Sequence, residues 1–330
     1  MLNEKMVGLG SRRSVIREIF EYGKKRKAEI GEENVFDFSL GNPSVPTPAA
    51  VTAALERIIK ETDPVKLHGY TSAQGDTAVR AKIAESIEKR FGFSANKDLI
   101  YMTCGAAASL TVTLNALINS GDEIIIPSPF FPEYRVFAEN AGARVVTVQC
   151  RKPDFQLDIK ATENAVTEKT KAIIINSPNN PTGAVFSPDT IKALSDMLCK
   201  KQAEYGTDIY IIADEPYREL SYGAEVPYIP KYYANTVICY SYSKSLSLPG
   251  ERIGYIFIPE SAKDSKKLYA AVCGAGRALG FVCAPSLMQY TVAECTDVLP
   301  DVSAYKKNRD LLFGALTDYG YEAVPPDGAF

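Results

Sequence analysis

The stretch that decides the fold is Thr236-Val237-Ile238-Cys239-Tyr240-Ser241-Tyr242-Ser243-Lys244. Its first five residues are mostly β-branched or aromatic, a composition typical of a buried strand. A lysine that follows such a strand is partly removed from water, which lowers its pKa and leaves some of the amine uncharged. An uncharged amine can form a Schiff base with a carbonyl compound. Because most single lysines lie in solvated loops, Lys244 needs partners elsewhere in the chain before it counts as functional.

The composition indicates a globular protein and excludes several classes of function. With 330 residues, 46% of them hydrophobic and 23% charged, the chain can form one large domain and a smaller one. A net charge of −3 gives no basic footprint for nucleic acid or for an anionic membrane surface, and the apolar runs are too short to span a bilayer. Seven scattered cysteines without a C-x-x-C pair, and a single histidine, predict a cytoplasmic protein with no metal site.

From residue 99 onward, apolar runs alternate with amphipathic stretches. This alternation predicts a mostly parallel sheet covered by helices on both faces, a three-layer α/β/α domain. The predicted strands are 99–102, 123–126, 145–148, 172–175, 209–212, 236–240 and 253–258. Near the start, a short strand is expected at 36–40, and Thr47 and Pro48 are expected to open a helix as N-cap and first-turn proline. The Gly- and Pro-containing residues 41–46 then predict a boundary near residue 45.

Five polar or glycine residues follow the predicted strand ends, where ligands bind in open α/β sheets. Gly105 opens a turn onto a helix whose free N–H groups suit a phosphate, and Arg252 can bind a phosphate with its forked guanidinium. Asp214 emerges from a buried strand, so its carboxylate needs a cationic partner. Asn180 and Tyr217 can hydrogen-bond a ring substituent. Each residue alone also has an ordinary reading as a turn, a core side chain or a surface ion pair.

Together, a set of ordered motifs resembles one family. The motifs are Gly69-Tyr70, Gln74-Gly75, Asn180-Pro181-Thr182-Gly183, Asp214-x-x-Tyr217, Ser241-x-Ser243-Lys244 and Arg252-x-Gly254. From about residue 36 to residue 330 the chain resembles the class I/II, aspartate-aminotransferase-like enzymes of fold type I, which depend on pyridoxal 5′-phosphate (PLP). The resemblance implies an enzyme that moves an amino group between an L-amino acid and a 2-oxo acid by a ping-pong mechanism.

The resemblance also implies roles for the residues around the cofactor ring. Lys244 would bind PLP as a Schiff base and move the substrate proton, and Asp214 would keep the pyridine nitrogen protonated. Asn180 and Tyr217 would hydrogen-bond the phenolic oxygen, and Asn180 would also contact substrate. Phe131 would stack on the ring, at a position where relatives often carry Trp or Tyr.

Further residues would bind the phosphate, the substrate or a second subunit. The phosphate would be held by Ser241, Arg252 and the backbone amides of Ala106 and Ala107 after Gly105. Ala106 and Ala107 offer no hydroxyl, so their amides must do more of this binding. Tyr70 would reach the phosphate of the neighbouring subunit, which implies a homodimer, and Gly41 would contact the substrate carboxylate.

The resemblance implies a discontinuous small α+β domain beside the large one. The large domain is expected at 46–300 and the small domain at 1–45 and 301–330. Relatives continue beyond the stretch that ends at Phe330, so we expect the C-terminal part of the small domain to be missing. The arginine that pairs with the substrate α-carboxylate is expected in that part, and the amino donor is not specified by the residues present.

Three other functions remain open from the sequence. Ser241-x-x-Lys244 also fits a serine–lysine acylase, but neither Ser-Asp-Asn nor Lys-Thr-Gly occurs in the chain. A PLP-dependent carbon–sulfur β-lyase of the same fold would start with the same proton removal and would release pyruvate and ammonia from cystathionine. A non-catalytic PLP-fold module is the third possibility, because the carboxylate-binding arginine cannot be assigned.

Overall fold

The structure is a computed structural model that describes residues 2–11 and 15–329. The chain divides into two compact units, Met1–Ser44 and Val45–Phe330. The first unit contains α1 (Glu4–Ser11), α2 (Val15–Ile30) and the 3₁₀ turn η1 (Glu32–Asn34). The spacing of Val15, Ile19 and Tyr22 predicts a helix from Ser14 to Ile30, and Ser14 lies outside the described residues. The predicted grouping of residues 1–45 with 301–330 in one small domain stays a prediction.

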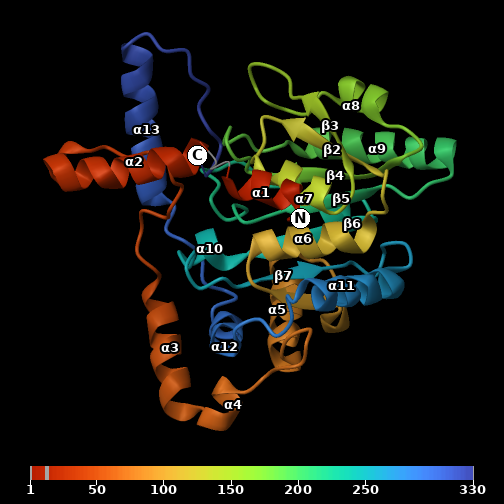
Figure 1. Ribbon diagram of the computed structural model, residues 1–330, viewed down its shortest axis with the longest axis horizontal. Helices are drawn as coiled ribbons and strands as arrows, with labels where there is room; N and C mark the ends of the chain where they lie inside the picture. Colours follow the sequence, from red (N-terminus) through yellow and green to blue (C-terminus); the bar gives the residue numbers. More distant parts are fainter. Residues whose placement is uncertain (1, 12–14, 330) are drawn as a thin grey trace. The chain divides into compact units, whose positions relative to one another are not determined.

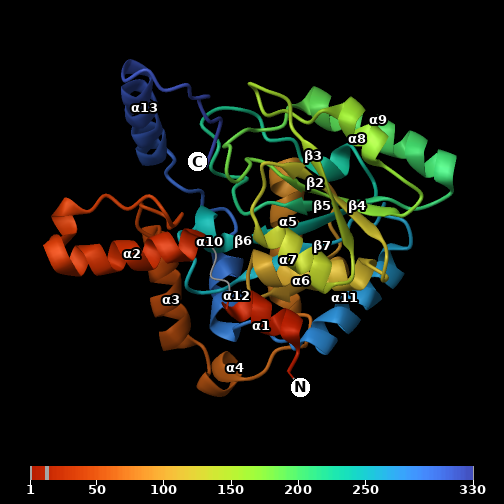
Figure 2. The same ribbon diagram turned by 45° about the horizontal axis from the view of Figure 1, so that its top comes forward.

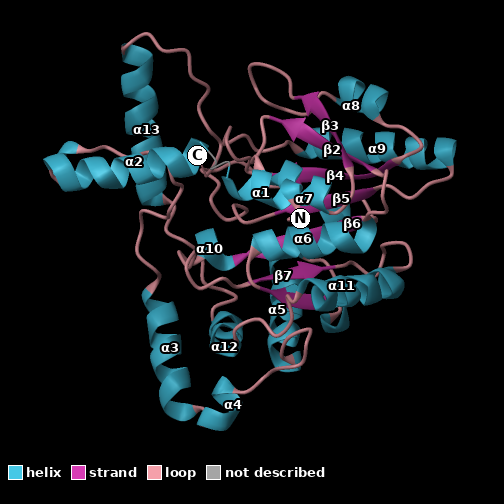
Figure 3. Ribbon diagram, in the orientation of Figure 1, coloured by secondary structure: helices cyan, strands magenta, loops and turns pink. Residues whose placement is uncertain are grey.

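The second unit carries a seven-stranded sheet and most of the helices (Figures 1 and 3). Its strands are β1 (Ile100–Thr103), β2 (Glu123–Ser128), β3 (Arg144–Gln149), β4 (Thr170–Asn176), β5 (Tyr210–Asp214), β6 (Thr236–Ser241) and β7 (Gly254–Phe257). Its α-helices are α3 (Ala49–Glu61), α4 (Pro64–His68), α5 (Thr77–Phe91), α6 (Ala106–Leu117), α7 (Glu133–Asn140), α8 (Ile159–Ala165), α9 (Pro188–Tyr205), α10 (Tyr242–Ser245), α11 (Ser265–Leu279), α12 (Ser286–Glu294) and α13 (Ser303–Asp318). Two further 3₁₀ turns are η2 (Lys97–Leu99) and η3 (Ile229–Lys231).

The strand order in the sheet is β1-β7-β6-β5-β4-β2-β3. β7 runs antiparallel to both of its neighbours, whereas the pairs from β6 to β3 are all parallel. The sheet is therefore mostly parallel, as the sequence predicts. The carboxyl ends of β4, β5 and β6 lie at one edge, where Asn176 pairs with Asp214 and Asp214 pairs with Cys239.

Helices cover both faces of the sheet, so the second unit has the three layers that the sequence predicts (Figure 2). The strand residues of one face share a hydrophobic core with α3, α5, α8, α9 and α12, and those of the other face share a core with α6, α7 and α11. Alternate residues of each strand point to opposite faces, so both faces of a doubly covered strand must be apolar. In β4, for example, Ile173 and Ile175 belong to the first core, and Ala172 and Ile174 belong to the second.

Two local predictions are wrong. Residues 36–40 form no strand, and both Phe36 and Phe38 are 82% exposed, because no neighbouring segment pairs with this short alternating run. Thr47 is not the N-cap of α3; that position is Pro48, which makes no side-chain capping bond. The Thr47 hydroxyl instead donates to the Ser247 carbonyl at 3.1 Å, and so ties two loops together.

Within residues 2–11 and 15–329, no helix is long and apolar enough to cross a membrane. The same residues contain no group of three or more His, Cys, Asp or Glu side chains that could hold a metal ion.

Candidate active site

A cavity of about 200 Å³ opens where β4, β5 and β6 end and α6 and α7 begin. Its lining combines aromatic rings, two cations and one buried carboxylate. The lining residues are Ala106, Ala107, Leu110, Phe131, Tyr134, Phe137, Asn180, Asp214, Pro216, Tyr217, Ser241, Ser243, Lys244, Pro249 and Arg252. Convergence of charged groups in an apolar concave site is typical of a ligand-binding cavity.

Asp214 is the last residue of β5 and is 4% exposed. Its Oδ2 accepts a hydrogen bond of 2.5 Å from the Tyr134 hydroxyl of α7. Its Oδ1 is buried and has no hydrogen-bond partner among the described residues. Burial raises the pKa of Asp214 to about 7; the Tyr134 hydrogen bond opposes this rise, and the nearby Glu215 adds to it. A buried carboxylate oxygen of this kind calls for a cationic hydrogen-bond donor inside the cavity.

Asn180 and Tyr217 come from the loops that follow β4 and β5. The Asn180 amide Nδ2 donates to the Tyr217 hydroxyl at 3.2 Å, and the Asn180 backbone N–H donates to Asn176 Oδ1 at 2.7 Å. The Asn176 amide in turn donates to the Asp214 carbonyl at 2.9 Å. These bonds connect the ends of the two strands, so both side chains enter the cavity beside Asp214. Burial raises the pKa of Tyr217, which keeps its hydroxyl protonated and able to donate.

Lys244 lies on the short helix α10, directly after β6, and is half-buried. Ser241 caps this helix, because its hydroxyl accepts from the Ser243 backbone N–H at 3.1 Å and pairs with the Ser243 hydroxyl at 2.7 Å. Burial lowers the pKa of Lys244, and the positive charge of Arg252 lowers it further. An amine in this setting loses its proton more readily than a solvated lysine.

Arg252 reaches the cavity from the loop before β7 and lies beside Gly105. A Cβ atom on Gly105 would stand 2.8 Å from Arg252 Nη2, and Gly105 has φ +85°, a conformation that favours glycine. The Arg252 Nη1 donates to the Pro249 carbonyl at 3.0 Å. α6 begins at Ala106 with no side-chain cap, so its first N–H groups and the guanidinium form one positive end of the cavity.

Nearly all of the predicted cofactor residues meet in this cavity. Ala106, Ala107, Phe131, Asn180, Asp214, Tyr217, Ser241, Lys244 and Arg252 line it, and Gly105 lies next to Arg252. Tyr70 does not line the cavity and is 98% exposed. Gly41 belongs to the first unit, and its predicted substrate contact stays a prediction.

Tyr134 is the important residue that the sequence analysis missed. It lies three residues after Phe131, in the first turn of α7, and the two rings meet edge to face with centroids 5.7 Å apart. The closeness of Tyr134 to Phe131 in the sequence is the one feature that could have indicated that Tyr134 lies at the cavity. Its contact with Asp214 could not be read from the sequence, because 80 residues separate the two. Leu110, Phe137 and Pro249 also line the cavity without having been predicted.

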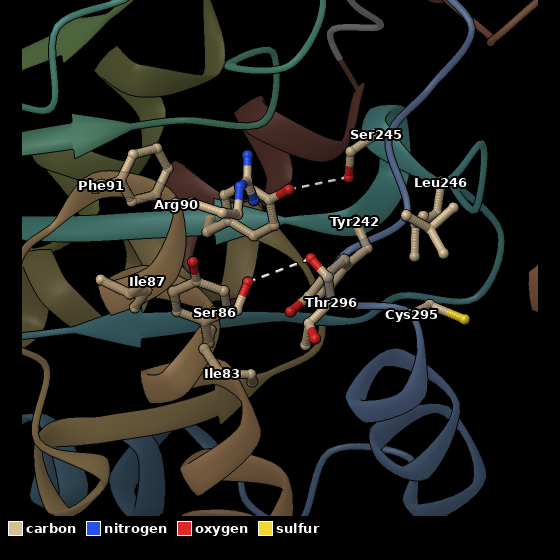
Figure 4. A pocket seen from close by; sticks show the side chains of 13 residues that line it. Ile83, Ser86, Ile87, Arg90, Phe91, Tyr242, Ser245, Leu246, Cys295 and Thr296 are labelled. Atoms are coloured by element: carbon tan, nitrogen blue, oxygen red, sulfur yellow. Dashed lines mark hydrogen bonds between the residues drawn. The ribbon is translucent and has the colours of Figure 1, made fainter.

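A second and much smaller cavity, of about 10 Å³, lies against α10 (Figure 4). Arg90, Tyr242 and Ser245 are among the residues that line it. The Tyr240 hydroxyl donates to the Ser245 hydroxyl at 3.0 Å, and the Ser86 hydroxyl donates to the Thr296 carbonyl at 3.2 Å. This volume holds about one water molecule, so the cavity is part of the support of α10 and has no room for a substrate.

Comparison with known proteins agrees with this fold and site. The profile of the family "Aminotransferase class I and II" matches residues 33–330. A crystal structure of an aminotransferase from Eubacterium rectale is 56% identical, with a TM-score of 0.97; the match covers 100% of this chain and 83% of that one. The aspartate aminotransferase of Thermus thermophilus, solved with maleate, is 26% identical with a TM-score of 0.86, over 100% of this chain and 84% of that one. An aspartate aminotransferase of Thermotoga maritima is 31% identical over 96% of this chain and 81% of its own length.

The fold and the cavity define an α/β enzyme with its site at the carboxyl ends of parallel strands. The chain belongs to the class I and II aminotransferase family. It is an aminotransferase, which moves an amino group between an amino acid and a 2-oxo acid, and enzymes of this family use PLP. The comparisons give the β-lyase alternative no better support.

Proposed function

We propose that the cavity binds PLP and that Lys244, Asp214 and Tyr217 are its catalytic residues. The observation that carries this proposal is that Asp214, whose buried Oδ1 has no hydrogen-bond partner among the described residues, lines the same cavity as Lys244. A protonated pyridine nitrogen is a cationic donor of the kind that this oxygen requires. The pyridine nitrogen of PLP would therefore supply the hydrogen bond that Asp214 Oδ1 lacks.

Each chemical group of PLP has a matching part of the lining. Asp214 would hold the pyridine nitrogen, Phe131 would pack on the ring, and Asn180 and Tyr217 would hydrogen-bond the phenolic oxygen. The phosphate would lie at the positive end, where Arg252, Ser241 and the amides of Ala106 and Ala107 gather after Gly105. The charged side chains of the lining support this orientation of PLP: the carboxyl group of Asp214 lies in the part assigned to the ring nitrogen, and the cation Arg252 lies in the part assigned to the phosphate.

The residues of this chain would then act on the substrate as follows. Lys244 Nζ, with its lowered pKa, would take the proton from the substrate Cα and return a proton later in the cycle. Bound PLP would supply an electron sink for the negative charge left at Cα. Asp214 would keep that sink effective by holding a proton on the ring nitrogen, and Asn180 would contact the substrate.

We also propose that the enzyme works as a homodimer in the cytoplasm. Tyr70 has its side chain 98% exposed, which is compatible with its predicted reach to the phosphate of a neighbouring subunit. The cytoplasmic location is supported by the cysteine pattern, because all seven cysteines are free thiols. The amino donor and the arginine that binds the substrate carboxylate are not part of the proposal.

Replacing Lys244 tests the covalent attachment of PLP. The purified wild-type protein mixed with PLP should develop a visible absorption band, and borohydride reduction should then fix the cofactor mass on the peptide that contains Lys244. Lys244→Ala should show neither the visible band nor the added cofactor mass. Its rate of transamination should fall by several orders of magnitude.

The matched control is Lys152→Ala, which removes an exposed lysine that does not line the cavity. This variant should behave like the wild type in both measurements. Reduction of the cofactor onto a different lysine, or full activity of Lys244→Ala, would refute the assignment.

A further inference from the structure

A short segment, Asp327–Ala329, joins the two loops that carry Asn180 and Tyr217. We call it the 327–329 segment. It lies more than a hundred residues after either loop in the sequence, and it lines no part of the cavity itself. The segment nevertheless forms hydrogen bonds with backbone groups of both loops.

The first loop follows β4 and is held by three hydrogen bonds. The backbone N–H groups of Asp327 and Gly328 both donate to the Gly183 carbonyl, at 3.0 Å each. The Val185 backbone N–H donates to the Asp327 carboxylate Oδ2 at 3.1 Å. Val185 is 5% exposed, so its N–H would lose its partner in a buried setting if the carboxylate were removed.

The second loop follows β5 and is held on the other side of the same segment. The Tyr222 backbone N–H donates to the Asp327 carbonyl at 2.7 Å, and the Ala329 N–H donates to the Leu220 carbonyl at 2.8 Å. Ser221 and Gly328 form an antiparallel bridge. A Cβ atom on Gly328 would collide with the Leu220 carbonyl and stand 2.9 Å from Pro178 Cγ, so the segment fits tightly against both loops.

α13 anchors the segment from outside the loops. The Arg309 Nη1 donates to the Pro326 carbonyl at 2.8 Å, and its guanidinium lies 4.9 Å from the centre of the Tyr222 ring. The residue before the segment and a residue of the second loop are therefore attached to the same side chain. This arrangement limits how far the segment can move away from the loops.

The two loops meet inside the cavity at one hydrogen bond. Asn180, three residues before Gly183, donates to the hydroxyl of Tyr217, three residues before Leu220, at 3.2 Å. The distance between these side chains depends on how the loops are held, and a loop held only at its ends would let them separate.

We propose that Asp327 is a positioning residue that fixes the Asn180–Tyr217 pair by bonding to both loops. This inference rests on the proposed function, in which that pair hydrogen-bonds the phenolic oxygen of PLP. Asp327 acts at a distance from the cofactor. Its carboxylate holds the first loop, and its carbonyl, which any residue would supply, holds the second. Loss of the carboxylate should therefore loosen the first loop most.

The experiment compares three variants of the full chain, with and without PLP. Asp327→Ala removes the acceptor for the Val185 N–H, and Asp327→Asn keeps an amide oxygen that can accept it. Glu322→Ala removes one negative charge from an exposed side chain five residues before the segment. Hydrogen exchange of residues 177–186 and 216–223 in the PLP-free protein is the first measurement, and the pH titration of the visible band with PLP is the second.

For Asp327→Ala we expect exchange at 177–186 to accelerate roughly tenfold, the equivalent of one lost hydrogen bond. The midpoint of the visible titration should rise, because weaker hydrogen bonds to the phenolic oxygen favour protonation of the cofactor–lysine pair. kcat should fall roughly tenfold with a smaller change in KM. Asp327→Asn should recover most of each effect, and Glu322→Ala should match the wild type.

A lower melting temperature of Asp327→Ala with an unchanged titration and unchanged loop exchange would overturn the proposal, because Asp327 would then be only a structural residue. Equal effects of Asp327→Asn and Asp327→Ala would also overturn it. If the wild type gave no visible band with PLP, the proposed function would fail. The exchange measurement would still decide whether Asp327 holds the loops.

Discussion

At the scale of single residues, Asp214 is a buried carboxyl group with a strongly raised pKa. Its carboxyl group is enclosed by β5 and α7, and burial raises its pKa from 3.8 to about 7. Without a cofactor, ionisation of this group therefore opposes folding. The unfolded chain releases the proton near pH 4, whereas the folded chain keeps it until about pH 7, so the free energy of unfolding falls as the pH rises between these values.

Asp214→Asn should remove this pH dependence in the PLP-free protein. The free energy of unfolding of the variant, relative to the wild type, should rise between pH 4 and pH 7 by at most on the order of 4 kcal/mol. Urea unfolding at a series of pH values measures this difference.

Binding of PLP provides the internal control for that experiment. A pyridinium donor on Oδ1 would favour the ionised carboxylate, so PLP should stabilise the wild type far more than the variant near pH 7. The variant should also lose turnover by orders of magnitude, because a neutral amide cannot hold the proton on the ring nitrogen. A constant difference across the pH range would contradict the raised pKa of Asp214.

Residues that follow a strand within a few positions could be found from the sequence. Asp214 and Lys244 stand directly behind apolar runs, and the carboxyl ends of parallel strands meet at one edge. Tyr134 could not be assigned, because its role depends on how α7 packs over β5. The exposure of Tyr70 could not be derived either, since it depends on a loop that lies outside the regular elements.

At the scale of elements, β6 and β7 approach each other closely at Gly254. A Cβ atom on Gly254 would collide with the Tyr240 carbonyl and stand 3.2 Å from the Cα atoms of both Gly105 and Ser241. Gly254 pairs with Ser241 in one neighbour and with Thr103 in the other. The first residue of β7 therefore sets the distance between the turn at Gly105 and the end of β6.

Gly254→Ala should push these two segments apart. The neighbours are backbone atoms that cannot rotate away, so we expect a loss of stability of about 1–3 kcal/mol and a weaker affinity for PLP. Thermal unfolding and a PLP titration measure the two effects.

Gly250→Ala is the matched control. A Cβ atom at Gly250 meets nothing within 4 Å, although it lies only four residues earlier. This variant should keep wild-type stability and PLP affinity. Equal behaviour of the two variants would show that the packing around Gly254 is looser than the structure indicates.

Elements with strong patterns were predictable, and isolated ones were not. Asp76 and Ser187 cap α5 and α9, and Gly92 and Gly206 end them; these residue types are recognisable helix start and stop signals in a sequence. The five residues 36–40 alternate like a strand, but a strand also needs a partner, which a local pattern cannot supply. The same limit explains Thr47, whose hydroxyl binds a loop two hundred residues away.

At the scale of the whole molecule, the proposed homodimer predicts that one subunit completes the site of the other. Tyr70→Phe and Lys244→Ala should each reduce activity when purified alone. When the two are unfolded and refolded together, mixed dimers should regain activity, because one of their sites combines an intact Lys244 with an intact Tyr70 from the other subunit.

A doubly substituted chain, Tyr70→Phe with Lys244→Ala, is the control for this mixing experiment. Refolded with Tyr70→Phe, it leaves no site with both residues intact, and it should give no recovery. Recovery in that control, or none in the main mixture, would argue against a shared site.

The position of β7 between β1 and β6 has a consequence for synthesis of the protein. β1 is made early, but its partner in the sheet is β7, more than 150 residues later. While β7 is still inside the ribosome, β1 has no neighbouring strand to pair with. Arg252, which lies just before β7 in the chain, is then not yet beside Gly105. We therefore expect the positive end of the cavity to form only after β7 has joined the sheet, and we expect the proposed PLP binding to require the complete chain up to that strand.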